Sequence, residues 1–229
     1  MRARVLATLL GVAVLAAGCT HSAGSGGQLT GALVSPTDVA LSWAPGDPSA
    51  AGHTVEYANT PDGPFTILDF VPAGRTSYTH PSLMPRTTFY YRTRPYYGPV
   101  SNVVTVTLPL GGQADTGNGQ PDWAAPGKRP EAAVTGTPGG APTGLTARVH
   151  DPTGILLTWT DRASDETGYL LEVRPSGSAT FAVVDVLDPD VNAVGYVVTD
   201  PNGRTAAYRV RAFRYGPPSN VVEETTGTG

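Results

Sequence analysis

Cysteine, lysine and histidine are scarce in this chain. Its 229 residues include one cysteine, Cys19, one lysine, Lys128, and four histidines. A single thiol excludes an intramolecular disulfide and any metal site that needs two thiolates. The histidines, at positions 21, 53, 80 and 150, form no pair with metal-ligand spacing. We therefore predict neither a bound metal nor a cofactor.

The common catalytic motifs are missing from the sequence as well. It contains no His-Glu-x-x-His, no Gly-x-Ser-x-Gly nucleophile elbow and no P-loop. Residues 188–192 have the acidic alternation of a calcium loop, but Ala193 stands where that loop needs glycine and Thr199 where it needs glutamate. A connecting turn is favoured there. We predict no catalytic residues and keep an enzyme with a site assembled from scattered residues as the weakest alternative.

The first 18 residues have the basic, apolar and small-residue order of a secretory signal. Their apolar run, residues 5–17, is too short to span a membrane as a permanent helix. It leads into Leu15-Ala16-Ala17-Gly18-Cys19, which resembles the lipobox of bacterial lipoproteins, although the leucine lies one place earlier than usual. The resemblance implies a lipoprotein signal peptide at 1–18, lipidation of Cys19, and anchoring on the extracytoplasmic side of a bacterial membrane. An ordinary signal peptide followed by free secretion is the alternative.

The charge of the processed chain limits its partners. Removal of residues 1–18 deletes Arg2 and Arg4, which leaves 13 basic and 19 acidic residues and a net charge near −6. A chain of this charge is not expected to bind nucleic acid or an anionic membrane surface through electrostatic attraction.

Two segments have compositions that cannot build a core. Residues 19–27 lack apolar periodicity and are predicted to be a flexible tether, and residues 110–140 are rich in Gly and Pro and are predicted to be a flexible linker. Trp123 stands alone in this linker. We weigh its docking on a domain edge or a partner against mobility, and favour mobility. Residues 225–229 are a short tail.

The segments on either side of the linker, 28–109 and 141–224, repeat one another. Leu41-Ser42-Trp43 recurs as Leu157-Thr158-Trp159, Tyr91-Arg92-Thr93-Arg94 as Tyr208-Arg209-Val210-Arg211, and Ser101-Asn102-Val103-Val104 as Ser219-Asn220-Val221-Val222. These matches occur in the same order in both segments, so they indicate an internal duplication and predict two domains of one fold.

Hydrophobic residues alternate with a period of two within each repeat. Val39, Leu41 and Trp43 alternate with small or polar neighbours, which predicts a strand with one buried face. No segment of useful length has helical spacing. Seven strands are expected in the first repeat, near residues 29–34, 39–44, 53–58, 65–70, 76–80, 88–95 and 100–107, and a matching set in the second. Seven short strands in about 85 residues predict a β-sandwich.

Particular residues of both repeats resemble fibronectin type III domains. The resemblance is carried by Trp43 and Trp159 on the second strand, by Leu83-x-Pro85-x-Thr87 followed by Tyr91-Arg92, and by Trp159-x-Asp161 with Glu166-x-Gly168-Tyr169. It covers nearly all of the chain outside the linker and the two ends. It implies an all-β fold of two tandem seven-stranded immunoglobulin-like β-sandwiches joined by a flexible linker. Its core markers are Trp43, Trp159, Tyr91 and Tyr208.

The sequence departs from the family at one structural position. The corner tyrosine falls on Phe89 in the first repeat and on Ala206 in the second, and neither has a phenolic hydroxyl to hold that turn. We therefore expect both domains to be less stable than the family average. Asp161, Asp165 and Glu166 lie in a loop that, in this family, usually forms hydrogen bonds to its own backbone, so a structural Asx turn is favoured over a site.

Two groups of residues are candidates for contact with a partner. Aromatic residues before the Gly-Pro turns are expected at the loop between the last two strands, which this family often uses for ligands; the alternative is that one ring of each pair closes the end of the sandwich. These residues are Tyr96, Tyr97, Phe213 and Tyr215. Arginines alternating along the sixth strand share its outer face: Arg92, Arg94, Arg209 and Arg211. They suit an anionic partner, but we favour cross-strand pairing with Glu56 and Glu172.

Taken together, these features predict a non-catalytic, membrane-tethered binding or spacer protein. Its two modules would be presented to an unidentified protein or polysaccharide in the cell envelope or outside it, and two linked modules gain by avidity. The alternative, an accessory module for polysaccharide binding or degradation, rests on analogy of fold alone. A free-standing hydrolase comes third and would need two carboxylates facing one cleft.

Overall fold

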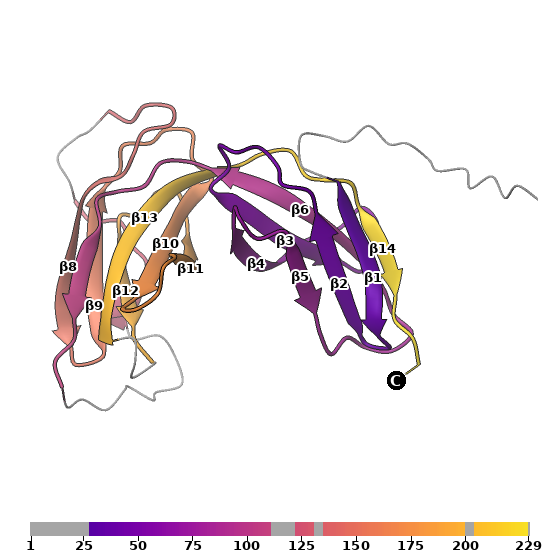
Figure 1. Cartoon of the computed structure of the whole chain (residues 1–229). Helices are drawn as coiled ribbons and strands as arrows, with labels where there is room; N and C mark the ends of the chain where they lie inside the picture. Colours follow the sequence, from indigo (N-terminus) through magenta and orange to yellow (C-terminus); the bar gives the residue numbers. More distant parts are fainter. Residues whose placement is uncertain (1–27, 111–121, 131–134, 200–203, 229) are drawn as a thin grey trace, which may run out of the picture.

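The computed structural model describes residues 28–110, 122–130, 135–199 and 204–228, and these are built almost entirely of β-strands (Figure 1). The predicted signal peptide, the tether and Cys19 lie outside the described residues. Among the described residues, the helical element η1 (Asp122–Ala124) is one 3₁₀ turn. In this part of the chain no helix has the length and apolar character needed to cross a membrane.

The first sandwich packs a three-stranded sheet against four strands. Its smaller sheet has the order β1-β2-β5, and the opposite layer has the order β4-β3-β6-β14, with all neighbours antiparallel. The strands are β1 (Leu29–Ser35), β2 (Asp38–Trp43), β3 (Gly52–Ala58), β4 (Thr66–Pro72), β5 (Ser77–His80), β6 (Thr88–Tyr97) and β14 (Val222–Thr225).

The second sandwich has the same arrangement. Its smaller sheet has the order β12-β9-β8, and the layer facing it has the order β11-β10-β13-β7. The strands are β7 (Val104–Thr107), β8 (Thr143–Asp151), β9 (Gly154–Thr160), β10 (Gly168–Pro175), β11 (Ala182–Leu187), β12 (Ala193–Val197) and β13 (Thr205–Tyr215). The predicted fold class, all-β with two seven-stranded immunoglobulin-like sandwiches, is confirmed.

The last strands of the two repeats are exchanged. β7 belongs to the first repeat but pairs with β13, with Thr105 opposite Ala207. β14 belongs to the second repeat but pairs with β6, with Glu223 opposite Tyr90. In Figure 1 the yellow β14 accordingly lies in the indigo and purple sandwich. The predicted boundaries, 28–109 and 141–224, therefore delimit sequence repeats and not folded units, because each sandwich takes one strand from the other repeat.

The two sandwiches are also joined where β6 and β13 end. Tyr96 pairs with Tyr215 and Tyr97 with Arg214, so one hydrogen-bonded sheet of eight strands runs through both sandwiches. The sandwiches form the two limbs of an arch, with this pairing at its apex (Figure 1). The limbs are therefore connected by the two chain crossings that exchange the last strands and by the strand pairing at the apex, and not by a free linker.

Each sandwich has its own hydrophobic core. The four predicted core markers, Trp43, Trp159, Tyr91 and Tyr208, are all buried, with at most 5% of each residue exposed. Val39 and Leu41 of β2, and Ile155 and Leu157 of β9, lie with them because the period of two places alternate residues on the inner face. Full burial of each such side chain contributes roughly 1.5–3 kcal/mol.

The described part of the predicted linker, residues 110–140, packs on the second sandwich. Trp123 stacks on His150 with ring centroids 4.2 Å apart and an interplanar angle of 9°, and Gly127 forms a β-bridge with Ala193. The favoured prediction of a mobile Trp123 is therefore corrected to docking on the second sandwich, where Trp123 contacts β8, β9 and β12. Gly154 and Gly195 permit this approach, because a Cβ on either would lie 2.3 Å from Trp123 or its neighbour Ala124. Composition alone does not reveal such docking.

Candidate functional site

Buried carboxylates lie on the third strand of each sandwich. Glu56 of β3 and Glu172 of β10 occupy equivalent positions, and each residue is 3% exposed. Arg92 Nε donates to Glu56 Oε2 at 2.6 Å, and Arg209 Nε donates to Glu172 Oε2 at 2.5 Å. The cross-strand pairing favoured from the sequence is confirmed. The burial of the carboxylates was not predicted, because a strand face with alternating charges indicates solvent exposure.

Three of the four candidate arginines donate hydrogen bonds to a carboxylate of this chain, whereas the buried Nε of Arg94 has no hydrogen-bond partner among the described residues. Arg92 stacks on Phe65 at 3.9 Å from the ring centroid, and Arg209 stacks on Phe181 at 4.0 Å. Arg211 donates to Glu172 at 2.6 Å and to the carbonyl of Gly98 at 2.5 Å. Arg94 lies 3.8 Å from Glu56 and over the ring of Tyr215. Each guanidinium thus contacts a carboxylate of this chain, which weighs against their use for an anionic partner.

The aromatic candidates lie where the sandwiches meet and not at a hairpin loop. Tyr96 and Phe213 are buried, with 3% and 2% exposed, and form a small cluster with Leu170. Phe70 packs edge-on against both rings, at centroid distances of 5.5 and 6.2 Å. Burial raises the pKa of Tyr96 to about 12.

Strand exchange explains why the predicted loop does not form. After Tyr97 and after Tyr215 the chain crosses to the other sandwich and does not turn back. Both tyrosines are half-buried, and Tyr97 lies against Gly216 at this crossing. The geometry therefore leaves little of this aromatic set free for a ligand.

A repeated Ser-Asn pair fixes each exchanged strand in its new sandwich. Asn102 donates to the carbonyl of Leu145 and accepts from its N–H, both at 2.9 Å, and Ser101 bonds both backbone groups of Val210. Asn220 makes the same two bonds to Leu29, at 2.8 and 3.0 Å. The recurrence of Ser-Asn-Val-Val was visible in the sequence, but its partners were not.

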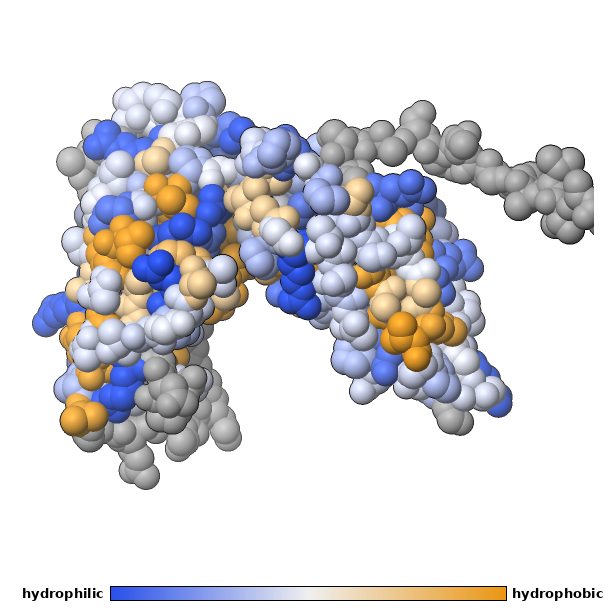
Figure 2. Space-filling view, in the orientation of Figure 1, coloured by the Kyte–Doolittle hydropathy of each residue, from blue (hydrophilic) through white to orange (hydrophobic). Residues whose placement is uncertain are grey.

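The outer strands β4 and β11 line a groove on the inner side of the arch. Residues 67–70 and 183–186 line this open groove, which has a volume of about 500 Å³. A neighbouring cavity of about 390 Å³ shares Phe70 and Val183 and reaches Tyr96 and Arg211 near the apex. Figure 2 shows the hollow between the two limbs. The sequence analysis did not predict this groove. A sign of it was present in the fourth strand of each repeat, which is apolar on both faces: Ile-Leu-Asp-Phe in the first and Val-Val-Asp-Val in the second.

Two carboxylates, Asp69 and Asp185, face this groove. Asp69 lies 3.9 Å from Arg75, and both of these side chains are exposed. Asp185 accepts a hydrogen bond from the Val186 N–H at 2.8 Å, and burial raises the pKa of its carboxyl. Charged side chains in the middle of an edge strand are a common device against unwanted strand pairing.

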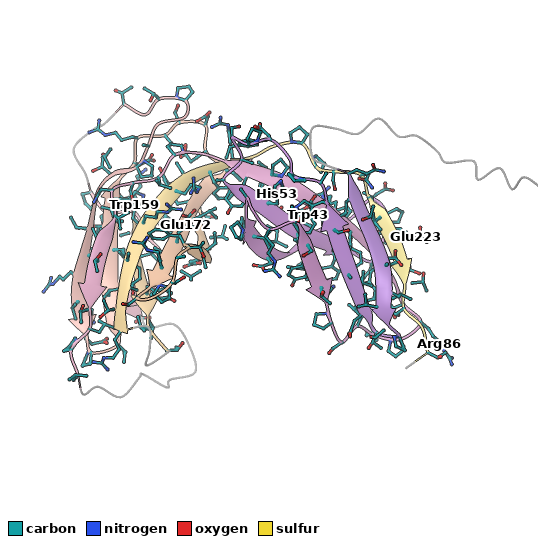
Figure 3. The ribbon with its side chains drawn as sticks, in the orientation of Figure 1. Trp43, His53, Arg86, Trp159, Glu172 and Glu223 are labelled. Atoms are coloured by element: carbon teal, nitrogen blue, oxygen red, sulfur yellow. The ribbon has the colours of Figure 1, made fainter. Side chains whose placement is uncertain are left out.

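A buried histidine lies in β3 of the first sandwich. His53 is 3% exposed, its two ring nitrogens have no hydrogen-bond partner among the described residues, and desolvation lowers its pKa. Its ring lies near that of Trp43, with centroids 6.3 Å apart (Figure 3). The equivalent residue of the second sandwich is Tyr169, whose hydroxyl donates to Asp161.

The acidic loop of the second sandwich is structural. Asp161 accepts from the Ala163 N–H at 2.9 Å, which confirms the predicted Asx turn. Asp165 accepts from the Gly139 N–H at 2.6 Å. Within the described residues no group of three or more His, Cys, Asp or Glu side chains could hold a metal ion.

Comparison with known proteins adds little to this geometry. No protein family model matches the chain, and no curated protein matches it. Among solved structures, it is similar to a two-domain fibronectin type III segment of chicken tenascin, with 15% identity, a TM-score of 0.28, and coverage of 89% of this chain and 99% of that one. It is also similar to the FN1–FN3 domains of chicken CNTN1, with 14% identity, a TM-score of 0.27, and coverage of 90% and 99%. The fold described above rests on its own strand pairing.

Proposed function

We propose that this chain is a non-catalytic binding protein of the bacterial cell envelope, tethered to a membrane at Cys19, whose interlocked sandwiches present one shared groove to a protein partner. The observation that supports it most is the reciprocal exchange of β7 and β14. Together with the pairing of β6 and β13, it holds the limbs in one arrangement and brings β4 alongside β11. Freely linked domains would not keep a groove made by both.

Strand exchange favours binding over a spacer role. In a spacer, the chain would enter at one end of the molecule and leave at the opposite end. Here Leu29 and Thr226 both belong to the first sandwich, since β14 returns to it. With the proposed anchor at Cys19, the first sandwich would be held near the membrane by a tether of nine residues. The second sandwich would then project from the first.

A protein partner is favoured over a polysaccharide by the position of the aromatic rings. Sugar sites rely on exposed aromatic faces, whereas Tyr96 and Phe213 are buried between the sandwiches. The groove offers aliphatic side chains and strand edges in their place. The carboxylates Asp69 and Asp185 do share this groove, as a hydrolase would need, but the Asp185 side chain is hydrogen-bonded to its own strand and Asp69 lies near Arg75.

Affinity capture from envelope extracts tests the proposed binding role. The full-length lipidated chain is the bait, and each captured protein is purified and measured again in direct binding. We expect at least one envelope protein to bind directly. Recovery of nothing beyond the background of an unrelated lipoprotein bait would contradict the proposal.

The proposed anchor is tested separately by intact-mass analysis of the protein from detergent-extracted membranes. We expect diacylglycerol at Cys19, and loss of membrane retention in Cys19→Ala. An unlipidated mass, with the protein in the medium, would overturn the anchor and favour free secretion.

A further inference from the structure

The strands β4 and β11 end the main path of the large sheet, whereas β7 and β14 are edge strands that branch from it. In the order β11-β10-β13-β6-β3-β4, β4 and β11 each have a partner strand on one side, and in the described part of the chain no strand pairs with the other side. An edge strand presents N–H and C=O groups that another extended chain can pair with. Figure 1 shows both strands on the inner side of the arch.

Three apolar side chains on these two edges are exposed to solvent. Ile67 is 38% exposed, Val184 is 41% exposed and Val186 is 48% exposed. All three line the groove of about 500 Å³ between the edges. Each edge carries one charge, Asp69 or Asp185, as edge strands commonly do. The apolar side chains beside these charges nevertheless stay exposed in one groove, and a contiguous apolar surface of this kind marks a site for a partner.

The groove also has a charge preference. Asp69 and Asp185 lie at equivalent positions midway along the two edges. In the adjoining cavity, Arg209 and Arg211 are both paired with Glu172, so their charges are already partly compensated. Asp69 also lies 3.9 Å from the exposed Arg75, which compensates its charge only in part. The carboxylates therefore favour a basic side chain in a segment that binds along one of these edges.

We infer that the groove between β4 and β11 binds an extended polypeptide segment by strand addition. The bound segment pairs its backbone with one edge, places alternate apolar side chains against Ile67, Val184 and Val186, and carries a lysine or arginine near Asp69 and Asp185. This is recognition by β-augmentation. It rests on the proposed binding function and names the chemistry of the partner.

The register of the edges limits the length of the added strand. The pairing of β3 with β4 shifts so that Leu68 has no opposite residue, and the pairing of β10 with β11 shifts in the same way at Val184. A bulge of this kind bends an edge and interrupts its ladder. We therefore expect a short pairing of a few residues on one side of the bulge.

The test uses a phage-displayed library of random short peptides, selected on the full chain. Enriched peptides are then measured against the wild type, Val186→Lys and the control Val221→Lys, which changes a valine of similar exposure, 44%, outside the groove. We expect alternating apolar residues with a lysine or arginine between them. We also expect Val186→Lys to weaken binding by about ten-fold or more and Val221→Lys to leave it unchanged.

Two further variants examine charge and backbone pairing. Replacing the basic residue of the best peptide by norleucine should weaken its binding to the wild type, but much less to the double variant Asp69→Asn, Asp185→Asn. N-methylation of alternate peptide amides should abolish binding, because strand addition needs those N–H groups.

Several results would overturn the inference. They are the absence of any enriched peptide, equal binding to Val186→Lys, undiminished binding after N-methylation, and retention on an insoluble polysaccharide that Val186→Lys abolishes. Failure here together with successful envelope capture would remove the groove as the site and leave the binding function. Failure of envelope capture would count against the binding function itself.

Discussion

At the scale of single residues, the fold is stabilised by charged side chains that the sequence pattern predicted to be exposed to solvent. Glu172 is buried between β10 and β13 and receives hydrogen bonds from two arginines. Breaking such a pair by removing one partner leaves buried charge without compensation. In the first sandwich Glu56 receives one hydrogen bond from an arginine, Arg92, and one from the hydroxyl of Thr54, at 2.8 Å.

Glu172→Ala should therefore destabilise the protein strongly. We expect a loss of about 3–5 kcal/mol in the free energy of unfolding, because Arg209 and Arg211 lose their buried counter-ion. Arg75→Ala is the control, since its pair with Asp69 is exposed and contributes roughly 0–1 kcal/mol. Chemical denaturation measures both. Equal, small losses would contradict the role assigned to the buried carboxylate.

His53 should make stability depend on pH. Burial lowers its folded-state pKa below the ordinary value of 6.5, so below that pH the unfolded chain binds a proton that the folded chain does not. Stability is then lost as the pH falls through and below 6.5, whereas most carboxylate effects come lower. The pKa of His80 is also lowered by burial and adds a change of the same sign.

His53→Phe tests this contribution. The variant should lose less thermal stability than the wild type between pH 7.5 and pH 5.5, and His80→Phe should remove a separate part. Thermal midpoints in matched buffers provide the measurement. An identical pH dependence in His53→Phe and the wild type would exclude a buried neutral histidine at this position.

At the scale of elements, each sandwich depends on a strand from the other repeat. β14 covers the edge of β6, where Val222 faces Tyr91 and Thr225 faces Thr88. β7 covers β13 in the same way. The Ser-Asn pair before each strand then fixes it to the first strand of the receiving sandwich through Asn102 and Asn220.

Deletion of residues 222–229 should therefore damage the first sandwich, although these residues belong to the second repeat. We expect amides of residues 88–94 in β6 to lose hydrogen-exchange protection by about an order of magnitude or more, while residues 205–211 of β13 keep theirs. Hydrogen exchange read by mass spectrometry distinguishes the two segments. Loss confined to β13 would mean that each repeat uses its own last strand.

The strands and the cores could be predicted from the sequence, but the pairing of the last strands could not. The period of two in Val39-Ala40-Leu41-Ser42-Trp43 places a strand and its buried face by local geometry alone. By contrast, Ser-Asn-Val-Val occurs in both repeats, and its partners, Leu29 and Leu145, lie near the start of equivalent strands, β1 and β8. Either arrangement satisfies the same local bonds, so only long-range geometry decides between them.

The candidate site also has one part that the sequence predicted and one part that it did not. Pairing of Arg92 with Glu56 follows from neighbouring strands and was predicted, whereas the groove between β4 and β11 exists because two repeats are held together. The rings of Tyr96 and Phe213 looked free for a ligand because a hairpin was assumed. A change in chain path at Gly98 and Gly216 buries them.

At the scale of the whole molecule, strand exchange makes two repeats into one body. Its limbs share an eight-stranded sheet, and the C-terminal strand closes the N-terminal sandwich. Each limb therefore holds a strand from the other repeat. The shared groove, the proximal position of the first sandwich and the binding proposal all depend on this connection.

Cross-strand disulfides test strand exchange most directly. Thr88 lies opposite Thr225, with their hydroxyl oxygens 2.9 Å apart, and Thr107 lies opposite Thr205 at 3.0 Å. In a Cys19→Ala background, the pair Thr88→Cys, Thr225→Cys should oxidise to an intramolecular disulfide in the monomer, since directly opposite residues meet the distance requirement. The pair Thr88→Cys, Thr107→Cys should stay reduced. Formation of the 88–107 disulfide, with 88–225 left reduced, would show that each repeat keeps its own last strand and would contradict the account.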